Sequence, residues 1–397
     1  MKSDRKNDLQ GRLEGLDPNE RRKLYKRAAR MRRAACEKKE GRGEAKWHPG
    51  ADDDVVLERN VRRRQDSIHE WALRLLAQER AAGSELDRPP AELYGTVTTI
   101  GPGFCRVDAD GEDLGCELAP DIAREQKTAI AVGDEVGLHS PGDGRWIAVE
   151  VKPRRTWLSR PDPFLQHVER VLVANVDPVC VVAALRQPDL QPEMVDRFVV
   201  AIRRGQAEPL ILANKADLLA PDERDEGLAL LDAWARAGIR VLPCSAETGE
   251  GIDALRQLLE GRTTAFVGLS GAGKSSLLNA LRPGLGIAVN AVRDYDARGR
   301  HTTTASMLHD LGGGTRAIDT PGVRRFGLWG LEPDELGGHF PELLEASAAC
   351  RFRDCTHTHE PHCAVKQGVA DGLLPEARYE SYLKILRTMR GKPTYDR

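Results

Sequence analysis

The chain has 397 residues, 30% of them charged and 5% aromatic, and its formal net charge is −2 at pH 7. This length is enough for two or three domains, each with its own hydrophobic core. No apolar run approaches the roughly 20 residues that a membrane-spanning helix needs, and the polar, basic N-terminus has no apolar segment of the secretory type. We therefore expect a cytoplasmic, monomeric protein that does not act in a membrane and whose cysteines are reduced.

Residues 1–90 are predicted to form a basic, helix-prone N-terminal extension. Lys and Arg are concentrated in runs such as "RRKLYKRAARMRR" at 21–33, and "SIHEWALRLLAQERAA" at 67–82 has the periodicity of an amphipathic helix. A basic segment of this kind suggests a polyanionic partner such as nucleic acid, although many charge runs are only solvated helix faces.

Residues 91–158 have the pattern of a small β-barrel domain. Short alternating stretches separated by Gly and Asp predict five strands, at 93–100, 103–110, 112–118, 134–140 and 145–151. Five strands at this spacing favour a closed barrel of the OB-fold type, which often binds nucleic acid. Its aromatic residues are few (Tyr94, Phe104 and Trp146), which favours recognition of backbone or shape over base stacking.

Residues 165–328 are predicted to form an α/β domain. Near-continuous apolar strands alternate with helical patterns, and we expect strands at 170–176, 178–185, 209–215, 240–246, 264–270, 305–311 and 315–322. Buried strands joined by helices indicate a mostly parallel, doubly wound sheet. In such sheets ligands bind beyond the carboxyl ends of the strands.

A phosphate-binding loop follows one of these strands. "GLSGAGKSS" at 268–276 matches the G-x-x-x-x-G-K-[ST] pattern and precedes a helical stretch. Its glycines let successive N–H groups curl around phosphates at a helix N-terminus, Lys274 is expected to reach the β- and γ-phosphates during catalysis, and Ser275 is expected to hold Mg²⁺. The predicted loop residues are Gly268, Ser270, Gly271, Ala272, Gly273, Lys274, Ser275 and Ser276.

Two further strand ends carry residues that can read guanine. In "NKAD" at 214–217, the Asp217 carboxylate can accept hydrogen bonds from guanine N1–H and its 2-amino group, a donor pair that adenine lacks. Asn214 is expected to bond the purine edge and the surrounding loop, and the stem of Lys215 to lie along the ring. Ser245-Ala246 matches the element whose backbone N–H meets guanine O6. These residues predict binding of GTP and GDP.

The guanine-reading element precedes the phosphate loop, the reverse of the order in ordinary GTPases. Loops that meet at one edge of a sheet need no particular order along the chain, and permutation is tolerated where domain termini lie close together. We therefore predict a circularly permuted GTPase domain with the join near residues 260–264.

Two segments are candidates for sensing the γ-phosphate. "DTPG" at 319–322 supplies Asp319 for Mg²⁺ and the Gly322 N–H for the phosphate, and "GRHTTT" at 299–304 supplies a Thr for Mg²⁺, Thr303 being favoured over Thr302. Val323 stands where many GTPases place a water-orienting Gln. His301 is the nearest polar candidate for that role, although a lone His is more often incidental.

Residues 329–397 combine helices with a cluster of cysteines and histidines. Cys350, Cys355, His357 and Cys363 would make a closed tetrahedral Zn²⁺ site, with His359 and His362 as rival ligands. Free cysteines beside surface histidines are the alternative. We expect an α-helical, zinc-binding C-terminal domain.

Taken in order, the barrel, NKAD, Ser-Ala, the phosphate loop, G-x-H-T-T-T, DTPG and C-x4-C-x-H-x5-C resemble the circularly permuted GTPase family RsgA, also called YjeQ or EngC. The resemblance covers about residues 91–390 and implies an OB-fold, a permuted GTPase domain and a zinc domain. It also implies a role in late maturation of the small (30S) ribosomal subunit, with GTP hydrolysis stimulated by that subunit. It further implies that His301 replaces the catalytic Gln and that Cys350, Cys355, His357 and Cys363 bind the zinc.

The N-terminal extension is longer than the family pattern, and we expect it to make additional rRNA contacts. Two other functions remain open from the residues. One is an RNA-binding assembly factor that uses GTP as a conformational switch with little hydrolysis, which Val323 keeps open. The other is a GTPase that acts on tRNA, membrane or metal traffic.

Overall fold

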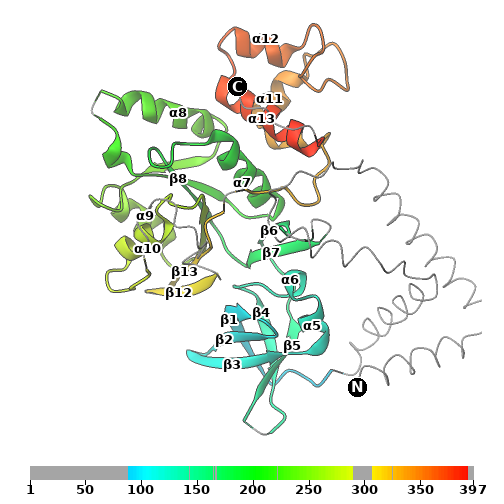
Figure 1. Cartoon of the computed structure of the whole chain (residues 1–397), viewed down its shortest axis with the longest axis vertical. Helices are drawn as coiled ribbons and strands as arrows, with labels where there is room; N and C mark the ends of the chain where they lie inside the picture. Colours follow the sequence, from blue (N-terminus) through cyan, green and yellow to red (C-terminus); the bar gives the residue numbers. More distant parts are fainter. Residues whose placement is uncertain are drawn as a thin grey trace, which may run out of the picture. The chain divides into compact units, whose positions relative to one another are not determined.

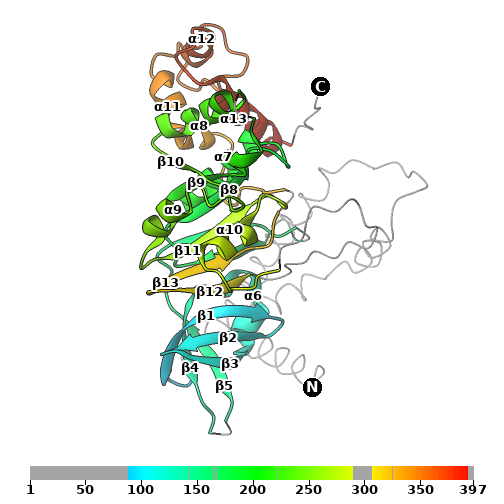
Figure 2. The ribbon, with the colours of Figure 1, turned by 90° about the vertical axis from the view of Figure 1, so that its left-hand side faces the viewer.

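The computed structural model describes residues 88–142, 144–163, 165, 168–220, 222–288, 306–323 and 325–391. The N-terminal extension before residue 88 lies outside these residues, as do His301, Thr302 and Thr303. The helices and strands below are shown in Figures 1 and 2. Within the described ranges no helix is both long and apolar enough to cross a membrane.

The first described domain is a closed five-stranded barrel. Its strands are β1 (Leu93–Gly101), β2 (Phe104–Ala109), β3 (Glu112–Leu118), β4 (Glu135–His139) and β5 (Trp146–Val151). They pair in the order β1–β2–β3–β5–β4–β1, and only the β3–β5 pair is parallel. In β2 the side chains of Cys105 and Val107 point into the core and Arg106 points out, as the period of two requires. The expected barrel is therefore confirmed.

The second domain is built on a mostly parallel sheet in the order β10–β9–β8–β11–β13–β12. Its strands are β8 (Val179–Ala184), β9 (Pro209–Asn214), β10 (Arg240–Pro243), β11 (Thr263–Gly268), β12 (Met307–Gly312) and β13 (Thr315–Asp319). Only the hairpin partner β12 runs antiparallel to its neighbour β13, and Met307 of β12 pairs with Thr99 of barrel strand β1. The barrel and this sheet are therefore joined by a strand ladder.

Helices cover both faces of this sheet, which makes it doubly wound. Val181 of β8 packs in one cluster with α7 (Pro192–Arg204) and α8 (Arg224–Arg236). The adjacent residues Cys180 and Val182 point to the other face and pack with α9 (Ile252–Leu259) and α10 (Lys274–Leu281). Because both faces are buried, every residue of β8 and β9 is buried, which is why these strands are continuous apolar runs.

One predicted strand lies elsewhere. The stretch expected at 170–176 forms β7 (Glu169–Ala174), which pairs antiparallel with β6 (Trp157–Pro161) in a separate two-stranded sheet. Arg170 and Leu172 of β7 are only half-buried, and a central strand of a covered sheet would have to bury both faces. β7 is instead attached to the barrel domain through a bridge between Val132 and Val173.

The C-terminal region is helical. It contains the 3-10 helix η3 (Leu336–His339) and the helices α11 (Pro341–Ser347), α12 (Ala364–Ala370) and α13 (Glu376–Met389). Arg378 of α13 forms a fully buried ion pair with Asp196 of α7, and Asp196 also accepts a hydrogen bond of 2.6 Å from Trp234 Nε1 of α8. These contacts fix α13 against the helices of the α/β domain.

Candidate nucleotide-binding and metal sites

The ends of three parallel strands bring the predicted nucleotide-binding residues together. Asn214 ends β9, Gly268 ends β11 and Asp319 ends β13. Gly268 is aligned with Val182 of β8, and Asp319 with Phe266 of β11. Parallel neighbours in register end at the same edge of the sheet, so the loops after these strands converge although they lie far apart in sequence.

The phosphate loop between β11 and α10 requires glycine at defined positions. Gly268 has φ +149° and Gly273 has φ +97°, and both values are strained for other residues. A Cβ on Gly268 would lie 2.3 Å from the carbonyl oxygen of Val182, and one on Gly273 would lie 2.2 Å from Asn214 Nδ2. Gly271, at φ +80°, completes the turn that precedes α10. The loop backbone therefore passes so close to Val182 and Asn214 that a side chain at Gly268 or Gly273 would not fit.

Asn214 connects the guanine-reading segment to the phosphate loop. Its side chain is 1% exposed, and its Nδ2 donates a hydrogen bond of 2.9 Å to the carbonyl of Ala272. Its Oδ1 accepts a hydrogen bond of 3.3 Å from the N–H of Ala246. One amide side chain thus bridges three predicted nucleotide-binding segments, and the inverted chain order leaves them in contact.

The other residues predicted to read guanine lie around this bridge. Lys215 has φ +63°, and its ammonium group donates to the carbonyl of Gln187, a contact that the motif alone did not indicate. Burial lowers the pKa of Lys215. Asp217 lies next to it at the surface, on the short helix η2 (Ala216–Leu218), where its carboxylate is accessible to a base. Ser245 is fully buried, and its Oγ accepts hydrogen bonds from the N–H groups of the next turn, so it shapes the backbone at Ala246.

Lys274, Ser275 and Asp319 form a polar cluster beneath the phosphate loop. Lys274 is 6% exposed, and its Nζ donates to the carbonyls of Gly268 and Leu269 at 3.3 and 3.1 Å. Burial lowers the pKa of Lys274 to about 8. Ser275 Oγ donates a hydrogen bond of 3.0 Å to Asp319 Oδ2. Burial also raises the pKa of Asp319, which this hydrogen bond and the charge of Lys274 partly offset.

This cluster fits a divalent cation. Asp319 Oδ1 is buried and has no hydrogen-bond partner among the described residues. A hard oxygen ligand of this kind, next to a serine hydroxyl, is what Mg²⁺ prefers. A Cβ on Gly322 would lie 2.7 Å from Ser270 Cα and 3.1 Å from Lys274 Nζ, so the backbone of the DTPG segment lies directly against the phosphate loop.

Thr320, within the DTPG segment, and Val323, directly after it, have structural roles. Thr320, which the sequence did not single out, is buried and donates a hydrogen bond of 2.6 Å to the carbonyl of Phe266, which holds DTPG to β11. Its only sequence signal is its place inside that motif. The N–H of Val323 donates to the carbonyl of Gly268 at 3.3 Å, and its side chain packs against the core of the α/β domain. Val323 therefore has no group that can orient a water molecule.

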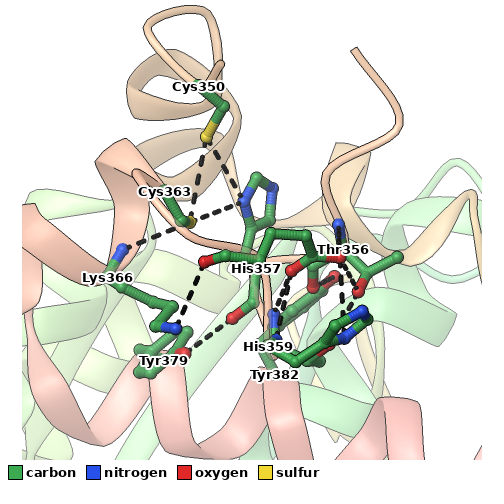
Figure 3. A network of polar contacts seen from close by, with 10 residues as sticks. Cys350, Thr356, His357, His359, Cys363, Lys366, Tyr379 and Tyr382 are labelled. Carbon is green, nitrogen blue, oxygen red and sulfur yellow. Dashed lines mark hydrogen bonds and ion pairs between the residues drawn. The ribbon is translucent and has the colours of Figure 1, made fainter. Parts of the chain in front are cut away.

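The cysteine–histidine cluster is assembled in the helical region (Figure 3). The ligand atoms of Cys350, Cys355, His357 and Cys363 all lie within 4.8 Å of one another. Cys350 Sγ lies 3.9 Å from Cys363 Sγ and 3.6 Å from His357 Nδ1, and Cys363 Sγ lies 3.4 Å from His357 Nδ1. Zn–S bonds of about 2.3 Å and Zn–N bonds of about 2.0 Å at tetrahedral angles separate two sulfurs by about 3.8 Å and a sulfur from a nitrogen by about 3.5 Å. The four side chains therefore fit a zinc ion.

The two rival histidines lie apart from this cluster. His359 is 84% exposed and contacts Glu360 and Thr358, and His362 is also at the surface. His357 has φ +58°, and its carbonyl accepts a hydrogen bond of 2.6 Å from Tyr379 Oη of α13. With this backbone conformation and anchor, the His357 ring lies beside the thiols of Cys350 and Cys363 (Figure 3).

Glu360 holds the loop between the ligands. Its carboxylate accepts hydrogen bonds from the N–H groups of Thr356 and Thr358, each at 2.9 Å, and from Thr356 Oγ1 at 2.6 Å. Burial alone would raise the pKa of Glu360, but these hydrogen bonds lower it to about 2. The carboxylate therefore stays charged at neutral pH and keeps the loop closed.

The chain is similar to known proteins over most of its length. The RsgA GTPase family model matches residues 151–329. The chain is 43% identical over 286 residues to the small ribosomal subunit biogenesis GTPase RsgA of Gemmatimonas aurantiaca, a match that covers 71% of this chain and 92% of that protein. It is 38% identical over 339 residues to the RsgA of Sodalis glossinidius, with coverages of 84% and 96%.

Solved structures show the same relationship. YjeQ from Thermotoga maritima aligns with a TM-score of 0.60 and 31% identity over 76% of this chain and 99% of its own. YloQ, described as a circularly permuted GTPase, aligns with a TM-score of 0.55 and 28% identity over 76% and 97%. Such identity over nearly whole relatives establishes kinship as well as fold: the chain belongs to the RsgA family of circularly permuted GTPases.

Proposed function

We propose that this chain hydrolyses GTP to GDP and phosphate and acts in late maturation of the small ribosomal subunit, which stimulates the hydrolysis. The observation that carries the nucleotide part is the hydrogen bond from Asn214 Nδ2 to the carbonyl of Ala272, because it brings the guanine-reading segment and the phosphate loop into one site. The subunit part rests on the relatives, which are named small ribosomal subunit biogenesis GTPases.

In the proposed site each residue acts through charge or backbone position. The Asp217 carboxylate selects guanine, and the N–H groups of 270–276 with Lys274 bind the phosphates. Ser275 and Asp319 hold Mg²⁺, which when bound offsets the negative charge of the phosphates. The backbone of Gly322 lies against the phosphate loop, where its N–H can meet the γ-phosphate.

A group other than Val323 must orient the attacking water. We propose His301 for this role, as the family pattern implies, and Thr303, favoured over Thr302, as the further Mg²⁺ ligand. If a water-orienting group is missing, the chain would instead be a GTP-dependent conformational switch with little hydrolysis, which is the alternative function.

We further propose one structural Zn²⁺ ion bound by Cys350, Cys355, His357 and Cys363. Four protein ligands leave no open coordination position, so the ion would stabilise the fold and take no part in chemistry.

The domains we propose are the extension 1–90, the OB-fold 91–158, the GTPase domain 165–328 and the zinc-binding domain 329–397. Small-subunit rRNA is the proposed partner, contacted in part by the basic extension, in the cytoplasm where such subunits mature.

The decisive experiment measures multiple-turnover phosphate release by the full chain alone, with small subunits, with large subunits and with bare RNA. We expect slow release alone and a large stimulation by small subunits only. Lys274→Ala should abolish release under every condition. His301→Ala should suppress release but leave GTP binding intact. Release that small subunits leave unchanged would reject the proposed function.

A further inference from the structure

A large cavity lies beside the proposed γ-phosphate sensor. One side of it is formed by Gly268 and by residues 320–323, and the other by α6 (Gln126–Ala129) and strands β6 and β7. Its volume is about 1010 Å³, which is at the upper end of the roughly 300–1,000 Å³ typical of small-molecule sites. The guanine-reading residues do not line it, so it is distinct from the base site.

Among the described residues, all charged side chains that line this cavity are cationic: Lys127, Arg160, Arg170 and Arg325. They come from α6, β6, β7 and the segment after DTPG, so the fold gathers them from four places in the sequence. Apolar side chains such as Val171, Leu172 and Phe198 line the rest. Cations beside low-dielectric walls attract an anion more strongly than the same cations would in water.

The described part of the chain supplies little negative charge at this cluster. The fully buried carboxylate of Asp162 lies 2.8 Å from Lys127 Nζ and 3.9 Å from Arg170 Nη1, so two cations share one acidic group. The Nε of Arg160 is buried and has no hydrogen-bond partner among the described residues. Arg325 is exposed and has no acidic partner within the described ranges.

The positive charges of Arg160 and Arg170, the two central arginines, repel each other. Burial and the nearby charge of Arg170 lower the pKa of Arg160, an effect that Asp162 only partly offsets. A guanidinium in such a place is stabilised by a second anion. Since Arg binds phosphate oxygens through paired N–H groups, phosphate is the chemistry that suits two neighbouring guanidiniums best.

We propose that this cavity is a second phosphate-binding site, in which Arg160 and Arg170, with Lys127 and Arg325 around them, bind a phosphate group. The group comes either from the backbone of RNA or from the inorganic phosphate that hydrolysis releases next to Gly322. The inference rests on the proposed function, because both sources follow from it. An anion bound here lies next to the DTPG segment, so its binding is coupled to the nucleotide site.

The test uses the full-length protein loaded with Mg²⁺ and a non-hydrolysable GTP analogue, so that the phosphate loop is already occupied. Inorganic phosphate is titrated in one arm and a short, unstructured single-stranded RNA in the other. The variants are the double change Arg160→Gln/Arg170→Gln and the single change Arg325→Gln. Arg256→Gln is the matched control, because Arg256 is a half-exposed arginine of α9 that pairs with Asp253 and does not line the cavity.

We expect the double variant to lose roughly tenfold affinity or more for at least one probe, since hydrogen bonds to charged groups contribute about that factor or more each. If the RNA is the ligand, the slope of log K against log salt should fall by about 1.4, and by about 0.7 for Arg325→Gln. The probe whose binding is lost identifies the source of the phosphate. Affinity for the GTP analogue should be unchanged.

Equal binding of both probes by wild type, the double variant, Arg325→Gln and the control would overturn the proposal. If the double variant no longer binds the GTP analogue, its fold is damaged and Arg325→Gln alone decides, because its exposed side chain supports no neighbour. A wild type that binds the probes through these arginines but fails to hydrolyse GTP with small subunits would reject the proposed function and leave this site standing.

Discussion

Replacing Asn214 with Ala tests whether the guanine-reading and phosphate-binding segments depend on each other. The change removes the donor to the Ala272 carbonyl and the acceptor of the Ala246 N–H. Ala272 is 1% exposed, so its carbonyl would lose its partner where water cannot easily replace it, whereas Ala246 is partly exposed and can be hydrated. An unpaired buried group costs about 1–3 kcal/mol, and we therefore expect a total of about 2–4 kcal/mol.

This cost is divided between folding and binding. Both hydrogen bonds are made within the protein itself, so part of the loss lowers its free energy of unfolding. The remainder of the cost weakens GTP binding, because the nucleotide must then order loops that the lost hydrogen bonds no longer hold. If all of it appeared in binding, GTP affinity would fall roughly 30- to 900-fold. Thermal unfolding and calorimetric titration with GDP and GTP measure the two parts.

Asn279→Ala is the matched control. Asn279 also makes one donor and one acceptor hydrogen bond, to the carbonyl and the N–H of Ile287 at 2.8 and 3.0 Å, but it touches no base-reading residue. This variant should lose stability without a comparable loss of nucleotide affinity. If Asn214→Ala binds GTP as tightly as Asn279→Ala does, the bridge does not organise the site and the reasoning is wrong.

Three further changes test other parts of the site. Asp217→Asn should shift nucleotide preference from guanine toward xanthine by a factor of ten or more, and competition binding that still favours GTP would contradict base reading by Asp217. Cys350→Ser should reduce bound zinc from about one ion per chain to near zero and cost about 4 kcal/mol or more of stability, whereas His362→Ala should change neither value in metal analysis and thermal unfolding. Burial lowers the pKa of Lys274 to about 8, and bound phosphates should raise it. Nucleotide binding above pH 8 should therefore take up a proton, and affinity should fall by up to tenfold per pH unit there while staying constant below about pH 7. Titrations at pH 9 in buffers of different ionisation enthalpy detect that proton, and its absence would contradict the assigned charge change.

Much of the fold is visible in the sequence because local pattern and burial agree. β8 and β9 are buried on both faces, so their residues are uniformly apolar and their bounds were predicted to within one or two residues. The glycines of the phosphate loop are equally readable, because their backbone conformations, with φ of +149° at Gly268 and +97° at Gly273, favour glycine. At these positions the residue type is set by burial or by the local backbone conformation.

What the sequence could not reveal depends on contacts between distant segments. The strand pattern of β7 is correct, but nothing local states that its partner is β6 instead of the main sheet. Asp196 and Arg378 are 182 positions apart, and their buried pairing leaves no periodic signal. The spacing of the histidines also left three candidate ligands, and it is the φ of His357 together with its anchor on Tyr379 that separates them.

The permuted order has one structural consequence for the segment after the proposed γ-phosphate sensor. Gly322 lies four positions before Phe326, whose ring packs on Phe198 of α7 at a centroid distance of 4.5 Å. Arg197 of the same helix donates to the carbonyl of Phe326 and also to Thr388 Oγ1 of α13 at 3.0 Å. Here the chain passes within a few residues from the proposed sensor to Phe326, which is held between α7 and α13. It then enters the helical region, where the segment between α11 and α12 carries the proposed metal ligands. Only a few residues of backbone therefore separate the proposed sensor from this anchored point.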